Sequence, residues 1–389
     1  MQSNKQKKKT KKFSKFLNNK MDFVLFITVL ILLSLGVVMV LSASAPSALS
    51  TTGKSYTYFI RQFGFAVFGV FAMLFVSKID YRFYKKYYWA VYIVSVAILL
   101  LVLVPGLGRE VKGATRWINV PGIGQIQPSE LTKIGMIIFY AGYLTDHKNE
   151  LKDFWRGFVK PLVFFLLPPV AILYLVQNHL SVCLVIGSVT FVMMLMAGCR
   201  LLHFIGTGIA GVAAIALYLI KGATGSTDSF RLDRIQTFFD PWSDATGTGY
   251  QMVQSLYAIG SGGLFGVGLG NSKQKYLYIP EPQNDFIFAI VAEELGFVGC
   301  VAIILLFAVF VWRGIVISMK APDMFGSLLA IGVTTLVAVQ AIINIAVVTA
   351  SIPTTGMALP FFSYGGTALV ILLVSVGVLL NVSRAGSKV

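Results

Sequence analysis

The sequence has few charged residues for its length. Only 12% of its 389 residues are Asp, Glu, Lys or Arg, about half of the roughly 25% that is usual in soluble domains. Hydrophobic residues make up 56% of the chain, and the mean hydropathy is +0.78. This combination excludes a disordered protein, a coiled coil and an ordinary soluble enzyme, and it indicates a protein that crosses a membrane several times.

Cysteine and histidine are also scarce, with three residues of each. The cysteines lie in or beside apolar segments and lack the spacing of a disulfide framework or a zinc site, so we interpret them as small packing residues. The histidines lack HExxH or any other metal-ligand spacing. We therefore expect no haem, and any metal would be a hard cation held by carboxylates.

Apolar runs of about 20 residues, without the alternation of barrel strands, predict an all-α polytopic membrane protein. We expect a basic, disordered cytoplasmic tail at 1–21, one membrane domain at 22–384 and a cytoplasmic tail at 385–389. About ten spans can be marked off within the membrane domain. They fall at roughly 22–42, 58–77, 87–105, 128–145, 160–177, 180–198, 202–220, 285–312, 325–350 and 365–383.

The positions of the basic residues predict the orientation. The net charge is +16, and eight lysines precede the first span. With this tail inside, the loops on the cytoplasmic side carry 21 of the 32 Lys and Arg residues and the outside loops carry 11. This bias agrees with the positive-inside rule and predicts both termini in the cytoplasm of a bacterium. We expect the tail to attract anionic membrane lipid rather than nucleic acid.

The longest connection, residues 221–284, is expected to lie outside the cytoplasm. Loops of this length in compact proteins are usually functional or disordered. Its Gly, aromatic and charged residues favour an ordered, functional loop. Chemistry on that side has no access to ATP or nucleotide sugars, which excludes kinases and nucleotide-sugar transferases, and no nucleotide cofactor is expected.

Asp285 follows this loop and opens the eighth span. Pro280 and Pro282 precede it, as is typical of a helix start, and the helix dipole would keep the carboxylate ionised. A shielded carboxylate at the outer face suits a general base or a ligand of a divalent cation such as Mg²⁺ or Mn²⁺. A helix-terminal acid without chemistry is the alternative.

Two further acidic residues, Glu293 and Glu294, lie two turns deeper on the same expected helix. Adjacent helical residues differ by about 100° in direction, so we predict that the two cannot face the same partner. Ionisable groups in spans are costly, so at least one is expected to pair with a cation from another span.

The start of the fourth span carries Glu130 and Lys133. Their i,i+3 spacing predicts a pair on one helix face, either structural or lining an anion site. Arg116 and Trp117 precede it in the outside segment 106–127. A tryptophan there is commonly a membrane anchor, but Arg beside Trp could also hold a pyrophosphate and a sugar face.

The long loop ends in the glycine-rich run 260–270, followed by Lys273 and Lys275. The run is either a cradle of backbone N–H groups for a phosphate or a tight re-entrant turn. The two lysines favour an anion such as a lipid pyrophosphate.

With these residues, the chain resembles the SEDS family (shape, elongation, division and sporulation proteins), whose branches are FtsW, RodA and SpoVE. The resemblance runs from about residue 22 to 384, with motifs in the expected order. They are Lys112-Gly-Ala-Thr-Arg-Trp-Ile118, Gln127-Pro-Ser-Glu130, Gly249-Tyr-Gln-Met-Val-Gln-Ser255, Gly262-Gly-Leu-Phe-Gly266, Pro280-Glu-Pro-Gln-Asn-Asp-Phe-Ile-Phe288, Glu293-Glu-Leu-Gly296, Pro360-Phe-Phe-Ser-Tyr-Gly-Gly366 and Leu380-Asn-Val-Ser-Arg384.

The resemblance implies an inverting peptidoglycan glycosyltransferase that polymerises lipid II and pairs with a class B penicillin-binding protein. Asp285 then matches the family's essential aspartate, and Arg116, Trp117, Glu130 and Lys133 match positions in its outer cavity. The residues around Asp285 look more like the division and sporulation branch than the elongation branch. A flippase for the same lipid and a non-catalytic scaffold for the transpeptidase are the alternatives.

The segment Gln177-Asn-His-Leu-Ser181 departs from the family pattern Gln-Pro-Asp-Leu-Gly. His179 replaces an acid, and a proline and a glycine are lost. Asn284 stands where threonine is usual. The function that the family assigns to that acid is therefore not carried over to His179, and the effect of the departure stays open.

Overall fold

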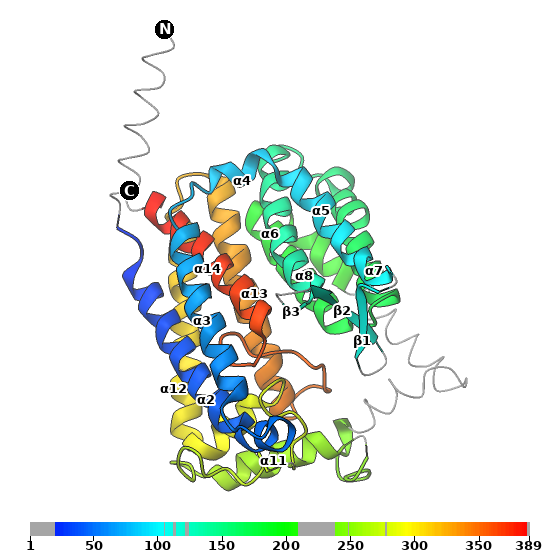
Figure 1. Ribbon diagram of the computed structural model, residues 1–389. Coiled ribbons are helices and arrows are strands. Elements are labelled where there is room, and N and C mark those ends of the chain that lie inside the picture. Colours follow the sequence, from blue (N-terminus) through cyan, green and yellow to red (C-terminus); the bar gives the residue numbers. More distant parts are fainter. Residues whose placement is uncertain are drawn as a thin grey trace, which may run out of the picture.

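The structure is a computed structural model that describes residues 20–104, 106–111, 114–120, 124–208, 238–247, 249–276 and 278–386. Seven helices in these ranges are long and apolar enough to cross a membrane (Figure 1). They are α2 (Phe23–Thr52), α3 (Thr57–Val76), the continuous segment η2–η3–α7 (Phe154–Val159, Leu162–Leu166, Leu167–Leu175), α8 (Leu180–Ala197), α12 (Ile287–Met319), α13 (Met324–Val348) and α14 (Gly366–Gly386).

Two more helices coincide with predicted spans but are shorter or less apolar. They are α5 (Tyr88–Leu100), continued by η1 (Leu101–Leu103), and α6 (Pro128–Asp146). Nine of the ten predicted segments therefore overlap the helices named above, and the multi-pass α-helical class is confirmed. The remaining segment, 202–220, is helical at residues 202–208 and otherwise lies outside the described residues, as does most of the basic tail.

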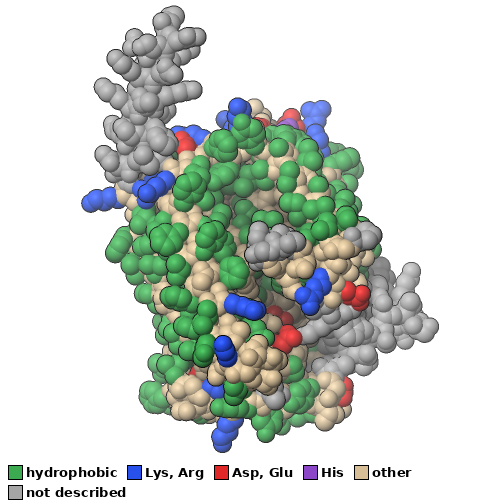
Figure 2. Space-filling view, viewed as in Figure 1, with side chains coloured by type: hydrophobic (Ala, Val, Ile, Leu, Met, Phe, Trp, Pro, Cys, Tyr) green, Lys and Arg blue, Asp and Glu red, His purple; other side chains and the backbone are tan. Residues whose placement is uncertain are grey.

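The two ends of the bundle differ in character. Helix α4 (Arg82–Lys86) and the end of α14 lie at one end, and α11 (Tyr250–Gly262) lies at the other (Figure 1). Figure 2 shows hydrophobic side chains over much of the surface between them, whereas charged side chains gather at the ends and beside a hollow in the middle. This distribution is the one expected of a chain whose middle lies in lipid.

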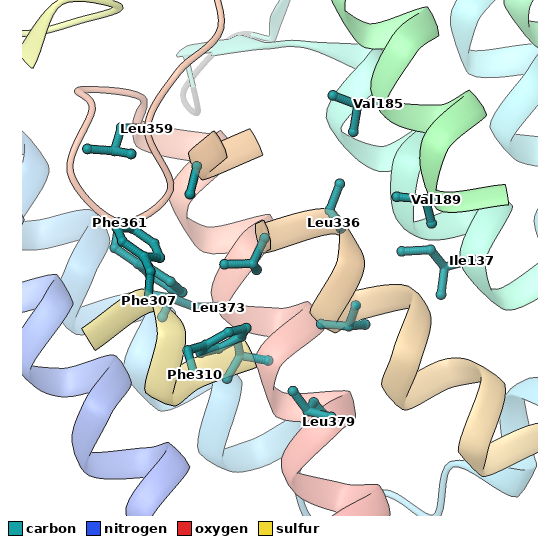
Figure 3. Packing of buried hydrophobic residues seen from close by; sticks show 14 of the residues in the cluster. Ile137, Val185, Val189, Phe307, Phe310, Leu336, Leu359, Phe361, Leu373 and Leu379 are labelled. Atoms are coloured by element: carbon teal, nitrogen blue, oxygen red, sulfur yellow. The ribbon is translucent and has the colours of Figure 1, made fainter. Parts of the chain in front are cut away.

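Helix α13 is the centre of the bundle and the most buried of the seven spans. It packs against α6, α8, α12 and α14. In Figure 3, Leu336 of α13 lies between Ile137 of α6 and Val189 of α8 on one side and the aromatic side chains of Phe310 and Phe361 on the other. All five are buried. The polar residues towards the C-terminal end of α13 are therefore carried on a rigidly packed helix.

The connection between α13 and α14, residues 349–365, folds back into the bundle. It reaches α2 at Gly36, where an added Cβ would overlap the carbonyl oxygen of Phe361. Phe361 and Phe362 are almost fully buried. Gly36 on the first span thus permits a backbone-to-backbone contact that holds the 349–365 connection in place.

A small antiparallel sheet lies in the predicted outside segment 106–127. Its strands are β1 (Gly108–Val111), β2 (Ala114–Val120) and β3 (Gly124–Ile126), in the order β1-β2-β3. No strand was expected from the sequence, so this sheet corrects the all-α expectation for the described residues. The strands are short and the β1–β2 register shifts between Arg109 and Glu110, so they leave little period-2 signal.

The contact at Gly36 gives a stability prediction. Replacing Gly36 with Ala should lower the free energy of unfolding by about 1–3 kcal/mol, because the new methyl group must displace the Phe361 backbone. The measurement is the thermal unfolding midpoint of the purified protein in detergent. Gly64→Ala in α3 is the matched control, since nothing lies within 4 Å of its added Cβ and alanine favours the helix. An equal response at both sites would contradict the role given to Gly36.

Candidate active site

Asp285 ends a turn that leads directly into α12. The backbone carbonyl of Asp285 accepts a hydrogen bond of 2.7 Å from Asn344 Nδ2 of α13, and the same amide group donates to the Met357 carbonyl at 2.6 Å. The Asp285 residue is half-buried. One asparagine from the central helix therefore holds both the aspartate turn and the 349–365 connection.

The 349–365 connection forms one wall beside this carboxylate. Gly356 has φ +66°, and a Cβ built there would lie 3.3 Å from Asp285 Oδ2. Nearby, Ser363 Oγ donates to the Asn284 carbonyl at 2.7 Å, and the Tyr364 N–H donates to the Gln283 carbonyl at 2.8 Å. The carboxylate thus faces bare backbone at a position where a side chain would be strained and crowded.

The same connection reaches the start of α8. Ser181 Oγ donates a hydrogen bond to the Thr355 carbonyl. Just before it, Arg116 of β2 donates from Nε to the Gln177 carbonyl at 2.9 Å and from Nη2 to the Asn178 carbonyl at 2.6 Å. These carbonyls follow the end of α7, where a cation is stabilising. Arg116 therefore attaches the sheet to the α7–α8 turn, and Trp117 lies beside it on β2, half-buried.

Glu130 and Lys133 form the predicted ion pair, with Lys133 Nζ 2.8 Å from Glu130 Oε1. The Lys133 side chain is 3% exposed and that of Glu130 19%. Both line a cavity of about 60 Å³ between α6, α13 and the connection, together with Gln340, Ser363 and several neighbours. The pair therefore borders a small cavity with both polar and apolar walls, which fits either a structural pair or an anion site.

His179 lies between α7 and α8 and is buried. Burial, and then the positive charges of Arg116 and Lys133, lower the pKa of its imidazole to about 3. The residue that replaces the family's acid is therefore neutral at pH 7. It brings no negative charge to the two cations, which leaves their positive charge less compensated at this end of the bundle.

Several buried polar atoms of this region have no hydrogen-bond partner in the described part of the chain. Buried polar groups are normally satisfied by protein or by ordered water, so a concentration of them indicates a space used by water or by a polar ligand. They are Ser129 Oγ, Gln177 Oε1, His179 Nδ1, Gln283 Oε1, Asn284 Oδ1, Asn344 Oδ1 and Thr355 Oγ1.

The structure thus connects most of the predicted site residues. Arg116 and Lys133 both act on His179, and Ser181 links that turn to the connection that faces Asp285. Asn344 and the Thr355–Gly356 pair were not among the predicted site residues. An asparagine within an apolar span was the available signal for the first, and the glycine between polar residues for the second.

The two lysines of the long loop behave differently. Lys273 is exposed. Lys275 is 3% exposed, and its Nζ donates to Glu294 Oε1 at 3.0 Å, to Ser42 Oγ at 3.1 Å and to the Gly270 carbonyl at 2.6 Å. A substrate could bind the Lys275 ammonium only by breaking this buried ion pair.

These contacts correct two predictions about the acidic pair. The cation of Glu294 comes from the preceding loop, not from another span. Glu293 and Glu294 also share a partner, because Ser272 Oγ donates to Glu293 and the Ser272 N–H donates to Glu294 at 3.3 Å. A compact turn can reach both directions on the helix, so the 100° separation of adjacent residues does not prevent them from sharing a partner.

The glycine-rich run also has a clear structural role. The N–H groups of Val267 and Gly268 donate to the carbonyls of Glu293 and Glu294 at 3.0 and 3.1 Å. A cradle for phosphate would need N–H groups such as these to be available. The re-entrant-turn interpretation therefore fits this part of the run.

Comparison with known proteins extends over nearly the whole chain. The model of a family of cell cycle proteins (FtsW, RodA, SpoVE) matches residues 23–388. Stage V sporulation protein E of Bacillus subtilis (strain 168) is 43% identical over 363 residues, 93% of this chain and 97% of that protein. A probable peptidoglycan glycosyltransferase FtsW of Trichlorobacter lovleyi is 41% identical, with 94% of each chain covered.

Two solved structures share the fold. A chain from a structure described as the coordination of polymerization and crosslinking by a peptidoglycan synthase complex has a TM-score of 0.77 at 26% identity. The match covers 94% of this chain and 98% of that one. The rod shape determining protein RodA of Thermus thermophilus has a TM-score of 0.67 at 27% identity, covering 94% and 97%.

The buried histidine gives a pH prediction. Because the folded pKa of His179 lies below its ordinary value of 6.5, the unfolded chain binds a proton that the folded chain does not. Stability should therefore fall as the pH is lowered from about 6.5 towards 3, by up to about 1.4 kcal/mol per pH unit. His179→Asn removes this component, so its unfolding midpoint should decrease less between pH 7 and pH 5 than that of the unmodified protein. Parallel decreases would show that the imidazole is not held neutral.

Proposed function

This chain belongs to the FtsW, RodA and SpoVE family of cell cycle proteins, and on that basis we propose that it is a peptidoglycan glycosyltransferase. It polymerises lipid II into glycan strands at the outer face of the cytoplasmic membrane, which it crosses several times. The identities of 43% to stage V sporulation protein E and 41% to an FtsW relative, against 27% to RodA, favour a role in sporulation or division over elongation.

Asp285 is the general base of the proposed reaction. Its carboxylate takes the proton from the 4-hydroxyl group of the acceptor sugar, and that oxygen attacks the anomeric carbon of the donor. The bond to undecaprenyl pyrophosphate breaks with inversion. The observation that carries this proposal is the placement of Asp285, half-buried just before the start of α12, with Oδ2 of its carboxylate beside the backbone of Gly356.

The leaving pyrophosphate is anionic and requires positive charge more than a proton. Lys133 lines the internal cavity, and Arg116 lies at the turn that contains the neutral His179. We assign the pyrophosphate to this end of the site, with Trp117 and Glu130 contacting the sugars. Lys273 is a further candidate cation for the substrate, because it is exposed in the loop that precedes Asp285. Positioning of the two lipid substrates supplies much of the remaining acceleration.

We propose a class B penicillin-binding protein as the partner. The support is the likeness to a chain whose structure is described as a peptidoglycan synthase complex that coordinates polymerization with crosslinking. A polymerase and a transpeptidase in one complex would act on the same strand.

Replacement of Asp285 tests this function directly. Asp285→Asn removes the base while keeping the shape, so polymer formation from purified lipid II should fall by about 10²–10⁴-fold. Asp240→Asn is the matched control, because it makes the same change at an exposed aspartate of the long loop, and it should retain the activity. Near-normal polymer from Asp285→Asn would remove the aspartate from the mechanism.

The donors near Asp285 also fit a hard divalent cation such as Mg²⁺ or Mn²⁺. Asp285 would hold it together with the amide oxygens of Asn284 and Asn344, neither of which has a hydrogen-bond partner among the described residues. Mg²⁺ usually takes only one or two protein carboxylates and completes its shell with water and substrate phosphates. When bound, such an ion would neutralise charge on the pyrophosphate.

Chelation tests the cation. Treatment with EDTA should lower the rate of lipid II polymerisation by at least tenfold, and added Mg²⁺ or Mn²⁺ should restore it. Asn344→Leu should weaken the binding of Mn²⁺ measured by electron paramagnetic resonance. Full activity in EDTA, with no bound Mn²⁺, would rule out the cation.

A further inference from the structure

Helix α12 is broken near its outer end. Gly296 has φ 66° and ψ −168°, far from helical values. The loop that follows α11 fills the break, because the N–H groups of Phe297 and Val298 donate to the carbonyls of Gly263 and Leu264 at 2.9 and 3.1 Å. Together with the reverse bonds from Val267 and Gly268, four backbone hydrogen bonds join the two segments.

The fit between these segments is tight. A Cβ added at Gly262 would overlap the Ala292 carbonyl, and one at Gly266 would overlap the carbonyl of Glu294. The glycine run therefore brings its backbone into direct contact with the helix.

Side-chain hydrogen bonds join the same two segments, the loop that follows α11 and helix α12. Glu294 accepts from Lys275 Nζ, from Ser42 Oγ of α2 at 2.6 Å and from the Ser272 N–H. Glu293 accepts from Ser272 Oγ, from the Lys273 N–H at 2.8 Å and from the Gln274 N–H at 3.4 Å. Both carboxylates are almost fully buried. We call Ser42, Ser272, Lys275, Glu293 and Glu294 the latch.

The ion pair of the latch joins the two ends of the segment 275–294, which contains Asp285. Lys275 and Glu294 are 19 residues apart, and Asp285 lies between them, ten residues after the lysine and nine before the glutamate. The Ser42 contact fixes this closure to the first span. The position of Asp285 therefore depends on the closed ends of the segment as well as on the Asn344 hydrogen bond.

We propose that the Lys275–Glu294 ion pair is a positioning device, which holds the turn containing Asp285 in the geometry needed for proton abstraction. This inference rests on the proposed function and assigns Lys275 a positioning role in place of direct substrate contact. A buried ion pair adds little net stability compared with apolar residues of similar size, but it specifies one arrangement. An error of about 1 Å at a reacting group can cost 10²-fold in rate.

The test is a double-mutant cycle on lipid II polymerisation by the full-length protein. Lys275→Met should lower kcat by about 10–100-fold with KM for lipid II nearly unchanged, because Asp285 is displaced while the cavity at Lys133 is intact. Glu294→Gln should also lower kcat, and the double variant should be no slower than Lys275→Met alone, since both act through one pair. Lys275→Arg, which keeps the charge, should recover most of the rate.

Hydrogen exchange supplies a readout that is independent of activity. In Lys275→Met, the amides of residues 278–292 should exchange faster, while those of α14 should not change. The matched control is Asp22→Asn, which breaks a partly buried ion pair with Arg313 at the start of α2 and should leave kcat unchanged. If Lys275→Met keeps the full kcat, or loses kcat only in proportion to a lower unfolding midpoint, the positioning role is wrong.

The result can be separated from failure of the proposed function. If Asp285→Asn still makes polymer, the base assignment fails whatever the latch variants do. If Asp285→Asn is inactive but the latch variants are fully active, only the positioning inference fails.

Discussion

The N-terminal end of α12 is organised around two carboxylates. Within a membrane span, such charges are costly unless other groups compensate them. Glu293 and Glu294 are adjacent and almost fully buried, and charged groups at such depth require a partner for each lone pair. The 262–275 loop supplies the donors. They are the ammonium group of Lys275, the hydroxyl and N–H groups of Ser272, and the N–H groups of Lys273 and Gln274. The break at Gly296 and the glycines of the loop allow the two backbones to come into contact beside this cluster of donors.

In the catalytic region, apolar side chains fix the position of α13, and polar side chains of the same helix hold the neighbouring segments. The centre of α13 is packed by aliphatic and aromatic side chains and fixes the helix in place (Figure 3). Its outer part carries Gln340, which lines the cavity, and Asn344, which holds the Asp285 turn. Polar side chains on a rigid helix hold their partners more precisely than side chains on free loops, which explains how a site made largely of connections can have a fixed shape.

Much of this organisation could be predicted from the sequence, since long apolar runs report directly on spans. The i,i+3 pair Glu130–Lys133 was also predictable, because a single helix fixes its geometry. The sheet at 108–126 was missed, since its strands are short and irregular. The partner of Glu294 was predicted on the wrong element, because tertiary contacts between a re-entrant loop and a helix break leave no periodic signal. The fold-back of residues 349–365, which places Gly356 beside Asp285, could not be predicted from the sequence for the same reason.

The order of the latch along the chain bears on how the protein enters the bilayer. Placing an Asp or Lys at the centre of an inserting helix costs about 2.5–3.5 kcal/mol on insertion scales, so two adjacent glutamates would hinder the insertion of α12. Their partners, Ser42 and residues 267–275, all precede them in the sequence. The donors are therefore synthesised before the acidic pair, so they are available to neutralise the carboxylates as α12 enters the bilayer.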